Sequence, residues 1–278
     1  DPLIKSQLLC QLSYGEFLIL YRLAKLLFLA YSENFRVKFF LLQEFLACLR
    51  KPQENLIFVS NGNSMNIENI IFDFGGVIID IDPQLTIKEL EKLGFLDIEK
   101  LKTKDFYQKV IFKFEKGIDT PAVFRDKLRE YLQMDITDQQ LDDAWNALLF
   151  DIPKERIQVI EEVKKHYPIY LLSNSNEIHY DLYVRDLQLR FGYREFDELF
   201  DKAYFSFDLH LAKPHVEIFE FVINQHQLNP PKTLFIDDRI ENIEGARKAG
   251  LKTYYLKSPQ RIRDIFQDGV LKSDLEIV

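Results

Sequence analysis

Cysteine and histidine are scarce in this sequence, which has two cysteines and five histidines among its 278 residues. Cys10 and Cys48 are too few to form a disulfide framework or a cysteine-ligated zinc site. The histidines are scattered along the chain and form no cluster that would suggest a metal site. The composition therefore argues against a disulfide-rich secreted protein, and we expect a reducing, cytoplasmic location.

Positively charged residues are fewer than negatively charged ones. Thirty-six lysines and arginines stand against 44 acidic residues, so the net charge is −8, which argues against nucleic acid or an anionic membrane as the main partner. No uncharged apolar run reaches the ~18 residues of a membrane span, and the start lacks a signal-peptide layout. With 47% hydrophobic residues, the chain can bury the core of one or two domains. We expect the protein to be a monomer or a homodimer.

Residues 1–64 differ in composition from the remainder. They are rich in Leu and Phe, contain no Met or His, and show helical apolar spacing over 18–30 and 39–49. Three interpretations compete: a helical appendage that packs on the catalytic body or a partner, an amphipathic surface-binding segment, or sequence upstream of a true start at Met65 that is read through without function. We favour the last, which predicts that a chain starting at Met65 folds and keeps its activity.

The stretch from Asn69 to Ile81, NIIFDFGGVIIDI, carries the strongest local signal. Its apolar residues 70–72 predict a buried strand that ends at Asp73, followed by Gly75 and Gly76. A charged side chain at the end of a buried strand is costly unless a partner or ligand there needs it. Open α/β sheets bind their ligands at this end of their strands. Asp73 is either a nucleophile or metal ligand beside a glycine-lined anion site, or a strand-end aspartate that caps a turn.

Three further apolar stretches, 169–172, 203–206 and 234–236, are followed by polar residues, namely Ser173-Asn174, Lys213 and Asp237-Asp238. Each has a simpler interpretation alone, as a helix cap, a surface lysine or a solvated carboxylate. Adjacent carboxylates at a buried strand end are tolerable if a divalent cation lies there, and oxygen ligands suit Mg²⁺. The alternation of strands and helices predicts an α/β fold with a Rossmann-like parallel sheet.

A long helical stretch, residues 82–153, separates the first strand from the second. We expect helices near 85–94, 104–116, 121–132 and 137–150, the third with Thr120 as N-cap. This stretch would form a cap over the strand ends of a core made of 65–81 and 154–278, or else a separate helical domain without an active-site role. Candidates for facing substrate are Phe112, Phe114, Glu115 and Trp145, although the aromatics suit a cap core equally well.

The order of these motifs, DFGGVIIDID, LLSNSN, LAKP and FIDDRIENIEGA, resembles the haloacid dehalogenase (HAD) superfamily from Met65 to about Leu256. The helical insert resembles the cap of subfamily I members, and the motifs look most like bacterial phosphatases of the α-D-glucose-1-phosphate type. The resemblance implies a Mg²⁺-dependent phosphomonoester hydrolase that acts on a small phosphorylated metabolite, with a sugar phosphate as the first guess.

The resemblance also implies roles for individual residues. Asp73 would be the nucleophile that forms an aspartyl-phosphate, and Mg²⁺ would be held by Asp73, the Gly75 carbonyl and Asp238, with Asp237 as a further or supporting ligand. The phosphoryl group would be bound by Ser173, Asn174, Lys213 and the backbone amides of Gly75 and Gly76. Asn242 stands where many members have another acid.

One departure from the family pattern bears on catalysis. Most phosphatases of this superfamily have a second Asp, two residues after the nucleophile, that protonates the leaving group, and here that position is Gly75. Asp80, Asp82 or Glu115 could supply the proton instead, although Asp80 and Asp82 are more simply loop residues. Two alternatives stay open: a catalytically weak or silent protein that binds a phosphorylated ligand or a partner, and a haloacid dehalogenase, whose reaction needs no metal.

Overall fold

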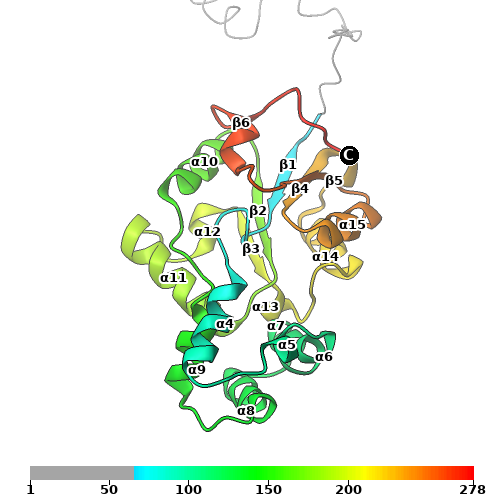
Figure 1. Ribbon diagram of the computed structural model, residues 1–278. Helices are drawn as coiled ribbons and strands as arrows, with labels where there is room; N and C mark the ends of the chain where they lie inside the picture. The colour runs from blue at the N-terminus through cyan, green and yellow to red at the C-terminus, as the bar shows by residue number, and fades with distance from the viewer. Residues whose placement is uncertain (1–65) are drawn as a thin grey trace, which may run out of the picture. The chain divides into compact units, whose positions relative to one another are not determined.

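The computed structural model describes residues 66–278, and the expectations for residues 1–64 lie outside the described residues. A five-stranded parallel sheet forms the centre of this part of the chain, in the order β3-β2-β1-β4-β5 (Figure 1). Its strands are β1 (Asn69–Phe72), β2 (Ile169–Ser173), β3 (Lys202–Phe205), β4 (Thr233–Asp237) and β5 (Lys252–Tyr255). The predicted α/β fold with a Rossmann-like sheet is confirmed.

The register of the sheet aligns the strand ends that carry polar residues. Phe72 of β1 pairs with Leu171 of β2 on one side and with Ile236 of β4 on the other. Asp73 therefore leaves the sheet level with Asp237, and its backbone N–H donates to the Ile236 carbonyl at 2.9 Å. These central strands are continuous apolar runs because both of their faces are covered.

Helices cover both faces of the sheet. Helices α10 (Lys154–Lys164), α11 (Glu177–Phe191) and α12 (Phe196–Leu199) contribute to the core on the face of Ile70, whereas α14 (Val216–His226) and α15 (Ile240–Lys248) pack on the face of Ile71. Alternate residues of β1 thus serve opposite layers, as expected of a strand. Helix α14 begins at Val216 with His215 at the N-cap position, so Pro214 lies just before the helix.

The remaining elements are short. A 3₁₀ turn, η2 (Pro230–Lys232), precedes β4, and α13 (Ser206–Leu209) directly follows β3. After β5 the chain forms the 3₁₀ turn η3 (Ile262–Asp264) and a hairpin of β6 (Phe266–Gln267) and β7 (Val270–Leu271). No helix within residues 66–278 has the length and apolar character needed to cross a membrane.

Residues 83–146 form a helical region, here called the cap, whose hydrophobic cluster also includes Ile178 of α11. Its elements are α4 (Pro83–Lys92), α5 (Ile98–Leu101), α6 (Lys104–Phe106), the π-helix η1 (Tyr107–Ile111), α7 (Phe112–Glu115), α8 (Pro121–Leu132) and α9 (Asp138–Asn146). Thr120 caps α8 as predicted, and Thr137 and Gln140 form a capping box on α9. The helix expected over 104–116 divides into α6, η1 and α7, and the helix expected to reach residue 150 ends at Asn146.

Two of the contacts between the cap and the core lie beyond the carboxyl ends of the strands (Figure 1). At the first, the ring of Trp145 in α9 stacks on His179 of α11 with centroids 5.2 Å apart, and His179 Nε2 lies 3.1 Å from the Trp145 carbonyl oxygen. At the second, the end of α7 lies against α13, where Ser206 Oγ donates to the Glu115 carbonyl at 2.5 Å. Phe114 and Trp145 are buried in the cap core, whereas Phe112 and Glu115 are half-buried.

Candidate active site

Three carboxylates and one ammonium group meet at the carboxyl edge of the sheet. Oxygens of Asp73, Asp237 and Asp238 lie within 4.8 Å of one another. The Lys213 Nζ lies 2.7 Å from Asp73 Oδ1 and 2.9 Å from Asp237 Oδ2. Residues separated by up to 165 positions in the sequence are therefore adjacent in space, as the strand-end pattern predicted.

The two oxygens of the Asp73 carboxylate have different surroundings. Oδ1 accepts a hydrogen bond from the Phe74 backbone N–H at 2.6 Å and also contacts the Lys213 ammonium. Oδ2 takes part in neither contact. Because a nucleophile needs an uncommitted lone pair, Oδ2 is the oxygen of Asp73 that is available to attack an electrophile.

Electrostatically the cluster is short of positive charge. Burial, together with the negative charge of Asp237, raises the pKa of Asp73 to about 8, although Lys213 acts in the opposite direction. Burial and Asp237 also raise the pKa of Asp238. For Lys213, burial lowers the pKa, but Asp237 and Asp73 outweigh it and raise the pKa overall. A divalent cation beside the carboxylates would supply the missing charge, and an all-oxygen ligand set suits Mg²⁺.

Asp237 is engaged by protein donors on both of its oxygens. The Asn242 side-chain amide donates to Oδ1 at 3.1 Å and to Oδ2 at 3.0 Å, and the Arg239 backbone N–H donates to Oδ1 at 2.8 Å. With Lys213 on Oδ2, this fully buried carboxylate holds the ammonium and the turn after β4 in place. Asp73 and Asp238 are therefore better placed than Asp237 to be direct metal ligands.

The two glycines after Asp73 serve different purposes. Gly76 has a φ of +76°, and a Cβ there would lie 2.1 Å from Asp238 Oδ2, so the Asp238 carboxylate occupies the space of the missing side chain. The Gly76 N–H donates to the Ile79 carbonyl at 2.7 Å, which commits it to the turn. Of the two backbone amides predicted to bind phosphate, Gly75 is thus the better candidate.

Asn174 uses its side chain to hold the backbone of Lys213. Its Nδ2 donates to the Lys213 carbonyl at 2.8 Å, and its Oδ1 accepts from the Lys213 N–H at 2.9 Å. Both ends of the amide are therefore occupied by the backbone of Lys213. The phosphate-binding role of Asn174 stays a prediction, and this geometry favours a role in positioning Lys213. The neighbouring Ser173 hydroxyl is buried and donates to the Asn174 carbonyl at 3.3 Å, a bond long enough to be exchanged for a ligand oxygen.

Ser206 is a residue of the site that the sequence did not indicate. Its hydroxyl accepts from the Ser175 N–H at 3.0 Å and donates to the Glu115 carbonyl, so it links the loop after β2 to the cap. Ser206 directly follows β3. The sequence shows only a serine at the end of a strand. Such a serine is as typical of an ordinary helix start as of a functional site.

The three carboxyl groups considered as proton donors differ in their environments. Arg156 Nη2 lies 2.8 Å from each oxygen of Asp80, so that side chain is held in an ion pair. Asp82 Oδ1 accepts from the Gln84 N–H at 3.0 Å and caps α4. Glu115 has no cationic partner within ion-pair distance among residues 66–278, and its Oε2 accepts from the Tyr107 hydroxyl at 3.1 Å.

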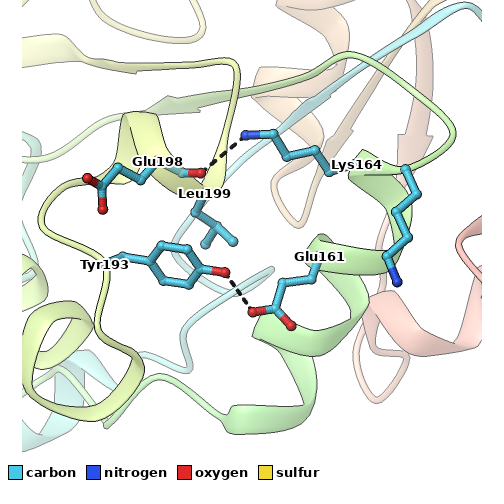
Figure 2. A pocket seen from close by; sticks show the side chains of 6 residues that line it. Glu161, Lys164, Tyr193, Glu198 and Leu199 are labelled. Atoms are coloured by element: carbon cyan, nitrogen blue, oxygen red, sulfur yellow. Dashed lines mark hydrogen bonds between the residues drawn. The ribbon is translucent and has the colours of Figure 1, made fainter.

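A separate pocket of about 260 Å³ lies beside α10 and α12 (Figure 2). In it the Tyr193 hydroxyl donates to Glu161 Oε1 at 2.7 Å, and Lys164 Nζ donates to the Glu198 carbonyl at 3.2 Å. Its polar side chains therefore have protein partners, and none of the candidate catalytic residues lines it. The carboxylate cluster is therefore the better candidate for the active site.

Comparison with known proteins identifies a matching family and a relative whose activity is known from its name. A model of haloacid dehalogenase-like hydrolases matches residues 67–250. The D-ribitol-5-phosphate phosphatase of Bacteroides thetaiotaomicron is 32% identical over 189 residues, which cover 68% of this chain and 91% of the relative.

Solved structures of HAD family enzymes are also similar to this chain. A HAD family enzyme of B. thetaiotaomicron in complex with magnesium and inorganic phosphate is 35% identical, with a TM-score of 0.66 over 72% of this chain and 100% of that one. A HAD-like family hydrolase of Porphyromonas gingivalis is 31% identical, with a TM-score of 0.63 over 70% of this chain and 93% of that one.

Proposed function

Because the chain belongs to the haloacid dehalogenase-like hydrolase family, we propose that it is a Mg²⁺-dependent phosphatase that hydrolyses the phosphate monoester of a small metabolite. The observation that carries this proposal is the convergence of Asp73, Asp238 and Lys213 at one edge of the sheet. This group combines an uncommitted carboxylate oxygen, a place for a cation and an ammonium group that can neutralise phosphate oxygens. A phosphoryl-transfer site needs all three.

The proposed metal site uses Asp73, Asp238 and the Gly75 carbonyl as ligands. The excess of carboxylates fits a bound cation, and the missing side chain at Gly76 lets the Asp238 carboxylate lie close to the turn after Asp73. When bound, Mg²⁺ would neutralise negative charge on the carboxylates and on the phosphate oxygens. The anionic Asp73 could then approach the phosphorus with less electrostatic repulsion. The magnesium and phosphate bound in the related Bacteroides enzyme support this assignment.

The reaction that we propose has two steps. Asp73 Oδ2 attacks the phosphorus, the bond between phosphorus and the ester oxygen breaks, and an aspartyl-phosphate forms. Water then attacks the phosphorus, which releases inorganic phosphate and regenerates the Asp73 carboxylate. Lys213 stabilises the negative charge on the phosphoryl oxygens in both steps, and Asp237 and Asn174 hold it in position.

A sugar or polyol phosphate is the proposed substrate class. The related Bacteroides phosphatase acts on D-ribitol 5-phosphate according to its name, and the backbone of the cap at Glu115 is bonded to Ser206, directly after β3. The cytoplasmic location and the monomeric or homodimeric state stay predictions.

The proposal is tested by phosphate release from a panel of sugar and polyol phosphates in the presence of Mg²⁺. We expect Asp73→Asn to reduce release to background, because an amide cannot act as the nucleophile. Removal of Mg²⁺ with a chelator should abolish release, and added Mg²⁺ should restore it. Asp135→Asn, the same change at an exposed cap residue, serves as the control, and undiminished release by Asp73→Asn would refute the proposal.

A further inference from the structure

Hydrolysis of an alkyl phosphate leaves an oxygen that must be protonated as its bond to phosphorus breaks. An alkoxide is a strong base, and a positioned acid at this oxygen is worth about 10²–10⁴-fold in rate. The carboxylates of Asp73 and Asp238 are assigned to the nucleophile and the metal, and Gly75 has no side chain. The proton donor must therefore come from another element, and the inference that follows rests on the proposed phosphatase function.

The end of α7 is held firmly against the core beside the catalytic edge. The Glu115 carbonyl accepts from Ser206, whose hydroxyl also accepts from the N–H of Ser175 in the loop after β2. The next carbonyl, that of Lys116, lies 2.8 Å from His210 Nδ1. At Gly117 a Cβ would lie 2.0 Å from the Phe207 carbonyl oxygen, so the backbones of cap and core are in direct contact. Glu115 is thus fixed relative to the ends of β2 and β3.

The Glu115 side chain belongs to the same electrostatic neighbourhood as the carboxylate cluster. The charges of Glu115 and Asp73 both raise the pKa of the Tyr183 phenol, which burial raises most. Arg239, the residue after Asp238, lowers the pKa of both Glu115 and Asp238. Two separate groups, Tyr183 and Arg239, therefore lie within electrostatic range of both Glu115 and a catalytic carboxylate.

We propose that Glu115 is the general acid and base of the reaction. In the first step its carboxyl group gives a proton to the ester oxygen as the bond between that oxygen and phosphorus breaks. In the second step the resulting carboxylate takes a proton from the water that attacks the aspartyl-phosphate. The proton gained in the second step replaces the one lost in the first, so each turnover leaves Glu115 unchanged.

The surroundings of Glu115 suit this role near neutral pH. Burial raises its pKa to about 7, while the Tyr107 hydrogen bond and the charge of Arg239 act in the opposite direction. The groups that face it are Tyr107 from the cap and Arg239 and Tyr183 from the core. Because the protonated form is the active one in the first step, kcat/KM for an alkyl phosphate should fall as pH rises through this pKa.

The test compares wild type with Glu115→Gln on substrates that differ in leaving group. We would measure kcat/KM, which reports only the steps up to leaving-group departure, for D-ribitol 5-phosphate and for a series of substituted phenyl phosphates. Loss of a general acid should cost about 10²–10⁴-fold on the alkyl ester and progressively less as the leaving phenolate becomes less basic. p-Nitrophenyl phosphate should be almost unaffected.

Two further variants separate chemistry from structure. Tyr107→Phe removes a hydrogen bond that favours the Glu115 carboxylate, so the fall in kcat/KM should move to higher pH. Glu130→Gln makes the same substitution at an exposed cap residue whose side chain has no hydrogen bond or ion pair among residues 66–278, and it should change nothing.

An equal loss of kcat/KM on every ester in Glu115→Gln, or no loss on the least reactive ones, would overturn the role of Glu115. Either result would leave the proposed function intact as long as hydrolysis of p-nitrophenyl phosphate still depends on Asp73. Hydrolysis of that ester that survives Asp73→Asn would instead show that the phosphatase proposal itself is wrong.

Discussion

At the scale of single residues, the position of Asp238 depends on the absence of a side chain at Gly76. The Asp238 carboxylate lies where a Cβ of residue 76 would be, and the carboxylate must stay there if Asp238 and Asp73 are to share a cation. Gly94 offers a matched comparison. It also has a positive φ, +101°, but its Cβ position has no atom within 4 Å among the residues of the described part of the chain.

We therefore expect Gly76→Ala and Gly94→Ala to lose similar stability and to differ in metal binding. Each places an alanine at positive φ, which costs about 1–2 kcal/mol of unfolding free energy. Only Gly76→Ala should displace Asp238 and raise the Mg²⁺ concentration needed for half-maximal activity, by more than about tenfold if one ligand contact is lost. Urea unfolding and Mg²⁺ titrations of phosphate release measure the two effects. Wild-type Mg²⁺ dependence in Gly76→Ala would contradict the assigned ligand.

At the scale of elements, Asn174 connects the end of β2 to the loop that carries Lys213. Its amide bonds both backbone groups of Lys213, so we expect Asn174→Ala to lower the unfolding free energy by about 1–3 kcal/mol, because the lost partner leaves polar groups unsatisfied. Urea unfolding of the metal-free protein measures this. Asn224→Ala, at an exposed position of α14, is the control and should be nearly neutral. Unchanged or increased stability in Asn174→Ala would favour the ligand-binding role that the sequence suggested.

The strand ends and the loop that holds Asn174 show how far the sequence could predict the site. Apolar runs that end in Asp73, Ser173 and Asp237 predicted the strands and their shared edge, because buried parallel strands are continuously apolar. The direction of a side chain was not predictable in this way. Whether Asn174 faces a ligand or a neighbouring backbone depends on the path of the loop around Lys213, which is far away in the sequence and enters only through the tertiary fold.

Helices were predictable where they carry clear signals at their ends. Thr120 and Thr137 began α8 and α9 as expected. Helix α11 was not predicted, because its buried residues include His179 and Tyr183 beside Ile178 and Leu187, so its apolar stripe is interrupted by polar groups. The π-helix within 107–111 was also not predicted, because a single turn of five residues is too short to show an apolar spacing of its own.

At the scale of the whole molecule, the family match and the first strand both begin just after Met65. The match starts at residue 67 and β1 starts at Asn69. The related Bacteroides structure is covered completely by 72% of this chain. These observations support the hypothesis that the catalytic unit does not need residues 1–64.

A chain that starts at Met65 should therefore be soluble, unfold cooperatively and hydrolyse the same substrates with unchanged kcat. Size-exclusion chromatography, thermal unfolding and phosphate release from the truncated and full chains make the comparison. An insoluble or inactive truncated protein would show instead that the first segment packs on the catalytic unit.

The central claim is that Asp73 becomes covalently phosphorylated during turnover, and trapping the intermediate tests it most directly. Acid quenching of the enzyme during hydrolysis of a ³²P-labelled substrate, followed by borohydride reduction and peptide mass spectrometry, identifies the modified residue. We predict that Asp73 alone is converted to homoserine, and only when Mg²⁺ is present. Modification of a different residue, or turnover without any trapped label, would contradict the account.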